Sequence, residues 1–289
     1  MDFPPLGTLR IASPADALRI SIVATAAFRY SPLFDWERPD HAKYPEDTLE
    51  SYHTQFLNAI QSDDHIVLVQ EDAYLGNENH KTTAIIPDGT GGTTPKAGDG
   101  VIVAVISIKL DPNSPHKGKL KNNKGLHLTA PENPGRDLNQ RRYDEWGTLS
   151  VAARKKNKAH KDSIISMIVV HPAYWRRGHG TRLATWARDL AIKDRVPQCV
   201  SAAPMSQCLF ISLGYRRLDE IVARGDEDDP RGAKTLLLEF GCEYRGGLCK
   251  RRLLRWIIMV AKDSLMGLVG LTQRTLGRVQ FYVFGNLWG

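Results

Sequence analysis

Cysteine is scarce in this sequence, and a secretory signal is absent. Only four cysteines occur in 289 residues, and no two of them form a Cys-x-x-Cys motif. The first residues include Asp2, Pro4 and Pro5 and lack the apolar core of a signal peptide. These absences predict a reducing location, with the cytoplasm as the default and the nucleus as the alternative. No metal site is predicted.

Acidic residues are almost absent from the C-terminal part of the chain. Residues 244–289 contain eight Lys and Arg residues and one acid, Asp263, which together account for the formal net charge of +7. Residues 1–243 are therefore formally neutral. Because a neutral fold has no general affinity for polyanions, no nucleic-acid partner is predicted.

A long uninterrupted apolar run is absent as well. The apolar stretch at residues 253–271 is broken by Arg255, Lys262 and Asp263, which argues against a membrane span. Residues 244–289 are instead predicted to form a basic amphipathic helical extension. Three roles stay open for it: packing on the preceding domain, bridging a homodimer, or contact with a membrane surface.

Hydrophobic periodicity predicts strands and helices before this extension. The predicted strands are residues 9–12, 65–70, 101–110, 163–170, 198–203, 215–223 and 234–240, and the predicted helices are 13–28, 45–60, 182–193 and 205–213. Residues 75–100 are rich in Gly, Thr, Asn and Pro, which predicts a mobile loop. Residues 111–162 form a second insertion, whose later part, 138–160, is compatible with a helix.

The most informative stretch joins a predicted strand to a predicted helix through a basic loop. The strand, residues 163–170, is followed by the turn 171–175 and the loop 176–181, which contains Gly178 and Gly180. Amides at a helix start lack intrahelical acceptors and carry partial positive charge, so they bind phosphate groups. No lysine follows Gly180 as a Walker loop requires, and no third glycine completes a dinucleotide-binding fingerprint.

This loop resembles the signature of the Gcn5-related N-acetyltransferase (GNAT) superfamily. The family motif is Arg/Gln-x-x-Gly-x-Gly/Ala after a strand that ends in Val-x-Pro. The sequence matches it at Val170-His171-Pro172 and at the two glycines, whereas Trp175 stands where the family usually has Arg or Gln. A second family motif, Leu-Gly-Phe/Tyr after a short helix, is matched by residues 213–215.

The resemblance implies a fold and a cofactor. The fold is α/β (α+β), with a central mixed, mostly antiparallel twisted sheet of about seven strands and helices on both faces. It would occupy residues 1–243, with insertions at 75–100 and 111–162, before the extension at 244–289. The cofactor would be acetyl-CoA or another acyl-CoA, bound by Ile168, Val169, Val170, Arg176, Arg177, Gly178, His179, Gly180 and Thr181.

The implied activity is direct transfer of an acyl group from CoA to an amine, with a small molecule as the favoured acceptor. The residues that move protons are not obvious. The strand at 163–170 has no carboxylate, Phe210 replaces the family's usual tyrosine acid, and Ala203 replaces its usual asparagine. The alternative is therefore a catalytically degenerate CoA-binding or interaction module.

Several side chains are candidates for catalysis or for the acceptor site. Ser166, Ser206 and Cys208 are the catalytic candidates, although Ser206 and Cys208 are also explained as ordinary helix residues, with Ser206 as an N-cap. Trp146 and the aromatics at 34–36 are predicted either to wall the acceptor site or to pack in the core. His171 is predicted to be exposed, and His179 to serve loop geometry or contact a phosphate.

Overall fold

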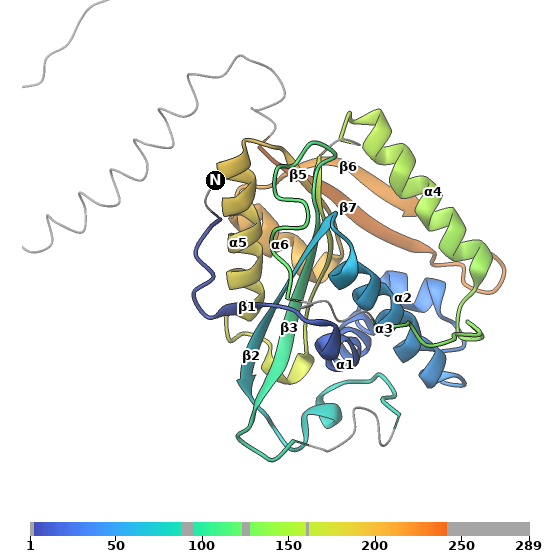
Figure 1. The fold of residues 1–289 in the computed structure, drawn as a ribbon. Helices are drawn as coiled ribbons and strands as arrows, with labels where there is room; N and C mark the ends of the chain where they lie inside the picture. The colour runs from blue at the N-terminus through green and yellow to red at the C-terminus, as the bar shows by residue number, and fades with distance from the viewer. Residues whose placement is uncertain (1–2, 88–94, 123–127, 160–161, 242–289) are drawn as a thin grey trace, which may run out of the picture. The chain divides into compact units, whose positions relative to one another are not determined.

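The structure is a computed structural model that describes residues 3–87, 95–122, 128–159 and 162–241. Its described residues form a seven-stranded sheet in the order β1-β2-β3-β4-β5-β7-β6 (Figure 1). The strands are β1 (Leu9–Ile11), β2 (His65–Ala73), β3 (Gly100–Lys109), β4 (Ser163–Val170), β5 (Gln198–Ala202), β6 (Arg216–Ala223) and β7 (Ala233–Phe240). All neighbours are antiparallel except β4 and β5, which are parallel. The predicted mixed, mostly antiparallel sheet is confirmed.

Helices cover both faces of this sheet, as predicted. They are α1 (Ala17–Phe28), α2 (Pro32–Glu37), α3 (Pro45–Gln61), α4 (Gln140–Lys156), α5 (His179–Asp194) and α6 (Pro204–Ser212), with short 3-10 turns at Pro14–Asp16, Glu78–Lys81 and Pro172–Tyr174. In β2, Ile66 and Leu68 pack in the core that contains α5. Val67 and Val69 pack in the core that contains α1 and α3. Because both faces are covered, the strand is a continuous apolar run.

Three aromatic side chains, predicted to wall the acceptor site or to pack in the core, are buried in the core. The connection after α1 contains the helix α2, which begins after Ser31, whose hydroxyl accepts the Leu33 amide at 3.3 Å. Phe34 and Trp36 on α2 and Trp146 on α4 are all buried in apolar clusters. The prediction that these side chains pack in the core is therefore confirmed.

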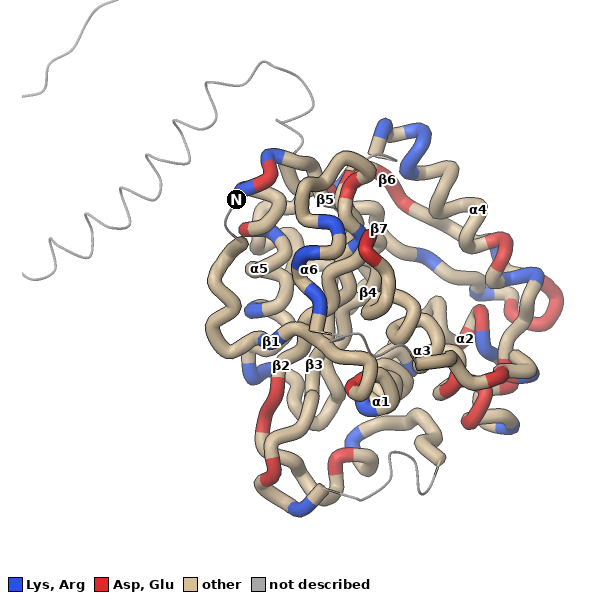
Figure 2. The backbone as a smooth tube through the Cα atoms, viewed as in Figure 1, with Lys and Arg blue, Asp and Glu red and all other residues tan. Residues whose placement is uncertain are grey.

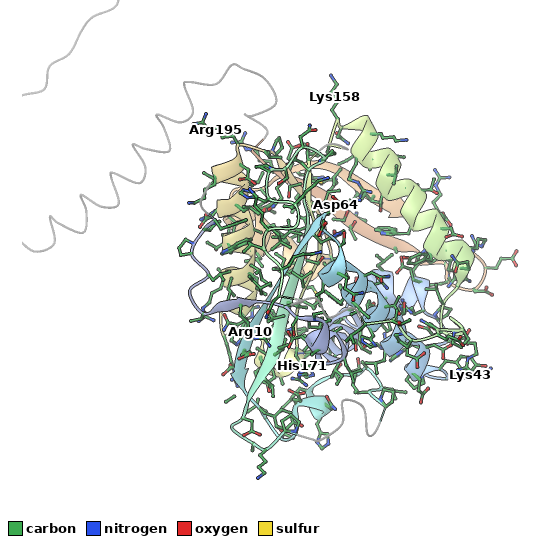
Figure 3. The ribbon with its side chains drawn as sticks, viewed as in Figure 1. Arg10, Lys43, Asp64, Lys158, His171 and Arg195 are labelled. Carbon is green, nitrogen blue, oxygen red and sulfur yellow. The ribbon has the colours of Figure 1, made fainter. Side chains whose placement is uncertain are left out.

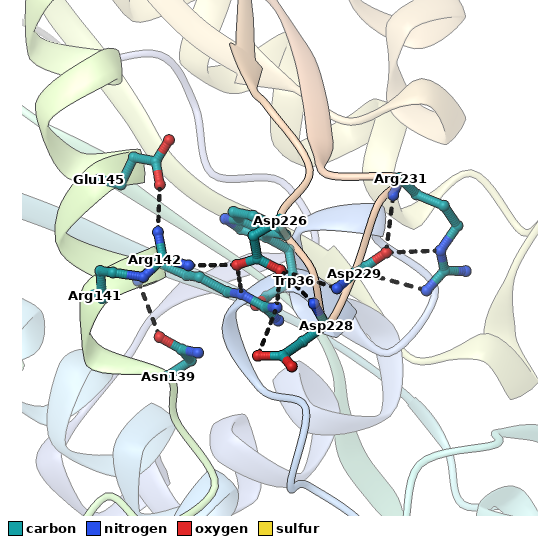
Figure 4. A network of polar contacts seen from close by, with 9 residues as sticks. All are labelled: Trp36, Asn139, Arg141, Arg142, Glu145, Asp226, Asp228, Asp229 and Arg231. Atoms are coloured by element: carbon teal, nitrogen blue, oxygen red, sulfur yellow. Dashed lines mark hydrogen bonds and ion pairs between the residues drawn. The ribbon is translucent and has the colours of Figure 1, made fainter.

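The buried Arg142 on α4 forms an ion pair with Asp226 in the turn between β6 and β7. The Arg142 guanidinium lies 4.4 Å from the ring centre of Trp36, and its Nε donates to Asp226 at 2.8 Å (Figure 4). The adjacent Arg141 also pairs with Asp226. These charges hold the pKa of the Asp226 carboxyl well below its usual range, with the Arg142 hydrogen bond as the largest cause. Helix α4 itself confirms the helical prediction for residues 138–160.

The two insertions are tied to the domain. Within 75–100, the turn Glu78–Lys81 buries Glu78, so the prediction of a mobile loop is wrong for this part. In the second insertion, Arg136 pairs with Asp47 at the start of α3, and the Leu128 amide donates to Gln61 at its end. Residues 128–137 therefore run alongside α3.

The predicted extension at 244–289 lies outside the described residues, so its helix and its three open roles stay predictions. The described residues all belong to one compact unit. Within them, no helix combines the length and the apolarity needed to cross a bilayer.

Candidate active site

Strand β4 is paired on one side along most of its length and on the other side only at its start. Its parallel pairing with β5 covers Ser163, Ile164 and Ile165 and then stops. Pairing with β3 continues from Ile164 to Val170. The second half of β4 therefore presents an edge with no strand partner among the described residues.

A β-bulge lies where this unpaired edge begins. Met167 is opposite Ser107 and Ile165 is opposite Ile108, so Ser166 has no partner on β3. A bulge inserts one extra residue and redirects the side chains that follow it. Accordingly, Ile165 packs in the core beneath α5, whereas Met167 packs against the core of α1 and α3.

Strand register shows which backbone groups are free at the edge. The His171 amide donates to the Val103 carbonyl at 2.9 Å. Bonded and non-bonded pairs alternate in an antiparallel ladder, so Val169 also turns its amide and carbonyl to β3. Ile168 and Val170 turn theirs to the open side. Val169 thus turns its backbone to β3 and buries its side chain, so its predicted contact with the cofactor stays a prediction that the register does not favour.

Trp175, which stands where the family motif usually has Arg or Gln, forms a hydrogen bond with this same edge. Its indole Nε1 donates to the Val170 carbonyl at 2.7 Å, and its ring packs edge-on against Tyr30 with centroids 5.1 Å apart. One of the free groups of β4 is thus already occupied. The groups that remain are the Val170 amide and both backbone groups of Ile168.

The loop after Trp175 gathers unpaired amides. Arg176 has a φ of +65° and Gly178 a φ of +83°, so the chain passes twice through the left-handed region. Helix α5 starts at His179, three residues before its predicted start, and the Arg182 amide makes its first bond, to Gly178, at 3.0 Å. None of the amides of residues 176–181 has an acceptor among the described residues. Such a concave cluster at a helix N-terminus binds anions.

Gly180 places this loop close to the end of β4 and to α6. A Cβ on Gly180 would lie 3.4 Å from Val170 Cγ2 and 3.8 Å from Leu209 Cδ2. These atoms belong to the end of β4 and to α6. A glycine here leaves room for a ligand to approach the backbone, which a larger side chain would fill.

Asp72 on β2 pairs with two basic side chains of the loop. No sequence pattern predicted this role of Asp72. Its Oδ2 lies 3.0 Å from Arg177 Nη1 and 3.0 Å from His179 Nε2. Burial disfavours the Asp72 carboxylate, but the Ala73 amide, Arg177 and His179 outweigh it and hold its pKa below the usual value. Figure 2 shows the basic residues at the end of α5 nearest β2. His179 is thus a buried, fixed part of the loop.

A cavity of about 420 Å³ lies on the other face of the sheet and reaches the bulge. Its walls come from α3, β2, β3 and β4: Gln55, Asn58, Ala59, Ser62, His65, Ser107, Ser166 and Met167. Six of these side chains are polar, and none is a carboxylate or an ammonium group. The Ser107 hydroxyl is fully buried and has no hydrogen-bond partner among the described residues.

A family sequence model described as "Acetyltransferase (GNAT) family" matches residues 144–207, which include β4, the loop and α5. A curated protein named "Acetyltransferase" from Stachybotrys chartarum is 28% identical over 232 residues, covering 80% of this chain and 89% of the relative. Residues 144–207 therefore match the acetyltransferase (GNAT) family, and most of the chain is similar to a protein named as an acetyltransferase.

Solved acetyltransferase structures show lower similarity. A putative acetyltransferase from Salmonella typhimurium, solved with its cofactor acetyl-CoA, is 16% identical with a TM-score of 0.41, and the match covers 81% of this chain and 92% of that chain. Arylalkylamine N-acetyltransferase 2 from Aedes aegypti is 14% identical with a TM-score of 0.42, and the match covers 80% of this chain and 97% of that chain.

The GNAT positions that depart from the family pattern are structural in this chain. Phe210 is fully buried, with its ring 5.1 Å from that of Tyr215. Ala203 is the N-cap of α6, and the Ser206 hydroxyl donates back to its carbonyl at 3.0 Å, so the predicted N-cap role of Ser206 is wrong. Cys208 is exposed on α6. Of the three catalytic candidates, only Ser166 lines the cavity at the bulge.

His171 is buried beneath the loop and is not exposed as predicted (Figure 3). Its Nδ1 accepts the Ala173 amide at 3.2 Å, and desolvation lowers its pKa to about 4. Beside it, Tyr174 donates to the buried carboxylate of Glu78 at 2.9 Å, and Glu78 also pairs with Arg19. This cluster joins α1 and the first insertion to the turn that leads into the loop at residues 176–181.

His171 makes the protein acid-sensitive in a defined window. Its pKa is about 4 in the folded chain and about 6.5 when unfolded, so between these values only the unfolded chain binds the proton. Stability is therefore lost as pH falls from about 6.5 to 4, by about 3 kcal/mol in total. His171→Asn keeps an acceptor for the Ala173 amide and removes the titration.

We expect urea unfolding of His171→Asn to depend less on pH than unfolding of the wild type between pH 6.5 and 4.5. The lowered pKa of Glu78 acts below this range, because the unfolded carboxyl binds its proton only below about 4.5. Parallel stability curves for the two proteins across this range would contradict the assignment.

Proposed function

We propose that this protein is an acyl-CoA-dependent N-acyltransferase that transfers the acyl group, most simply acetyl, directly to the amine of a small molecule. The observation that carries the proposal is the continuity of two backbone features. The unpaired edge of β4 leads straight into the amide-lined loop at the start of α5. Together they match a chain-like ligand that ends in a pyrophosphate.

In this proposal the loop binds the pyrophosphate and β4 binds the pantetheine arm. The amides of residues 176–181 supply uncompensated donors, and Arg176, Arg177 and Arg182 add positive charge. The carbonyl of Ile168 and the amide of Val170 pair with the amides of the arm, as an added strand would. The thioester then lies near the bulge at Ser166.

Position and electrostatics supply the chemistry. The amine nitrogen bonds to the thioester carbonyl carbon, the bond from this carbon to sulfur breaks, and the electron pair leaves with sulfur. The Ile168 amide is the strand donor nearest the bulge that faces the open side, so it stabilises the negative charge on the carbonyl oxygen. Holding both reactants at one site removes much of the entropic barrier.

The departing thiolate needs no dedicated acid in this scheme. A thiol of this kind has a pKa near 8.5, so its anion leaves readily and takes a proton from solvent or from the amine. Phe210 therefore does not preclude catalysis. The second candidate, a CoA-binding module without turnover, is favoured only by this buried Phe210 and by Ala203 in place of the family's asparagine.

The test combines binding and turnover. Calorimetry with CoA and acetyl-CoA measures cofactor affinity, and release of free thiol over a panel of small amines measures transfer. We expect micromolar binding and amine-dependent thiol release. Tight binding with no thiol release from any amine or acyl chain would favour the binding module, and no binding would refute both functions.

A further inference from the structure

We propose that His65 is the general base of this enzyme and that the cavity beside it takes a small, hydroxyl- or amide-bearing acceptor whose amine is weakly basic. The inference rests on the proposed function. It concerns residues outside the family motif, on β2, β3 and α3.

The cavity is placed to receive an acceptor. Its wall includes Ser166, the bulge residue where the free edge of β4 begins, and it lies on the face of the sheet opposite α5. A volume of about 420 Å³ matches a small molecule. Ser107 points to an occupant, because a buried hydroxyl without a partner is unfavourable unless a ligand or water completes it.

His65 lines the cavity, and its imidazole ring can accept a proton. Its Nδ1 lies 3.3 Å from the Ser62 hydroxyl. In the tautomer in which Nδ1 donates to this oxygen, the lone pair of the ring lies on Nε2. Nε2 has no partner among the described residues. Burial is the largest cause that lowers the pKa of His65, and the facing Lys109 lowers it further, whereas Asp64 (Figure 3) raises it. Lys117 is paired with Asp64. The ring is therefore neutral at pH 7.

The lining of the cavity also selects the acceptor. Amides and hydroxyls, from Gln55, Asn58, Ser62, Ser107 and Ser166, match the hydrogen-bonding groups of a polar neutral molecule. Because no carboxylate lines the cavity, an ammonium group gains no ion pair there. A neutral imidazole deprotonates an amine of pKa near 8 far more easily than one of pKa near 10.4.

The ammonium group of the acceptor gives one proton to His65 Nε2, directly or through one water, and becomes a nucleophile. The nitrogen bonds to the acyl carbon, the thiolate departs, and the second proton of the nitrogen neutralises it. His65 returns its proton to solvent. One amide, one thiol and one proton are formed.

The test compares three variants of the full chain for acetyl-CoA binding, kcat, KM and the pH dependence of kcat/KM. His65→Gln is expected to lower kcat about a hundredfold and to remove the acid limb of the profile, with cofactor affinity unchanged. Ser107→Ala is expected to raise the acceptor KM about tenfold, with kcat and stability kept. The acceptor in these assays is glucosamine, a weakly basic amino sugar, and spermidine is the strongly basic comparison.

Glu37→Gln is the matched control. Glu37 ends α2, outside the cavity wall, and burial raises its pKa to about 7, so it is the rival base. We expect this variant to keep the acid limb. Loss of the limb in Glu37→Gln but not in His65→Gln would overturn the inference, as would faster transfer to spermidine than to glucosamine. Such outcomes leave the proposed function intact, whereas absent acetyl-CoA binding in the wild type refutes that function itself.

Discussion

Replacing Gly180 by valine is expected to weaken acyl-CoA binding by about a thousandfold or more. A Cβ at this position already lies 3.4 Å from Val170 and 3.8 Å from Leu209. The two further methyl groups of valine therefore enter the space between β4 and α6 and cover the loop amides. Loss of two or three hydrogen bonds to a charged pyrophosphate, each worth about 1.5–3 kcal/mol, gives an effect of this size.

Two further glycine variants control this experiment. Gly180→Ala adds only the Cβ that the space accepts, so we expect it to fold normally and to bind with intermediate affinity. Gly147, inside α4, has open space around its Cβ position, and Gly147→Ala should bind CoA normally and gain about 0.5–1 kcal/mol of stability. Calorimetry gives the affinities. Wild-type affinity in Gly180→Val would mean that the cofactor does not cross this loop.

The second large effect is on stability, where Asp137→Ala is expected to lower the free energy of unfolding by about 3–5 kcal/mol. Asp137 is fully buried and pairs with Arg38, which is also buried and lies just after α2. Thr48 on α3 donates to Asp137 at 2.6 Å, and Arg38 Nη2 donates to Ser51 at 2.7 Å. Removing the carboxylate leaves the guanidinium charge uncompensated in the core.

The double variant Arg38→Met/Asp137→Leu removes both buried charges. It therefore distinguishes the loss of the ion pair from the cost of leaving one buried charge unpaired. Replacing a buried ion pair by apolar side chains is often neutral, so the double variant should recover most of the stability lost in Asp137→Ala. Urea unfolding followed by circular dichroism measures all three proteins. If Asp137→Ala is destabilised by less than 1 kcal/mol, or if the double variant is worse than the single one, the buried charge is not the cause.

Local sequence patterns predicted most of the strands and helices. Alternation and continuous apolar runs identified all seven strands within a few residues, because these patterns depend on which faces of a strand are covered. Helix α2 was missed because its six residues, Pro32–Glu37, are too few to show a helical period. The loop at 176–181 was recognised because its chemistry depends on backbone and glycines that are contiguous in the sequence.

The burial and contacts of single side chains were harder to predict, because they depend on residues that are distant in the sequence. His171 was expected to be exposed beside Pro172, but Glu78 and Arg19 from other elements enclose it. His179 is fixed by Asp72, which comes from β2 and carries no motif.

The sequence by itself predicted the fold class and the amide-lined loop at residues 176–181, because both depend on patterns among residues that are neighbours in the chain. Only the tertiary structure decided which backbone groups of β4 are free, since register belongs to a pair of strands and the bulge at Ser166 shifts it. Tertiary structure also brought His65, Ser107 and Ser166 to one cavity from three strands. No local pattern encodes such a meeting, because it arises from the packing of segments that are far apart in the sequence.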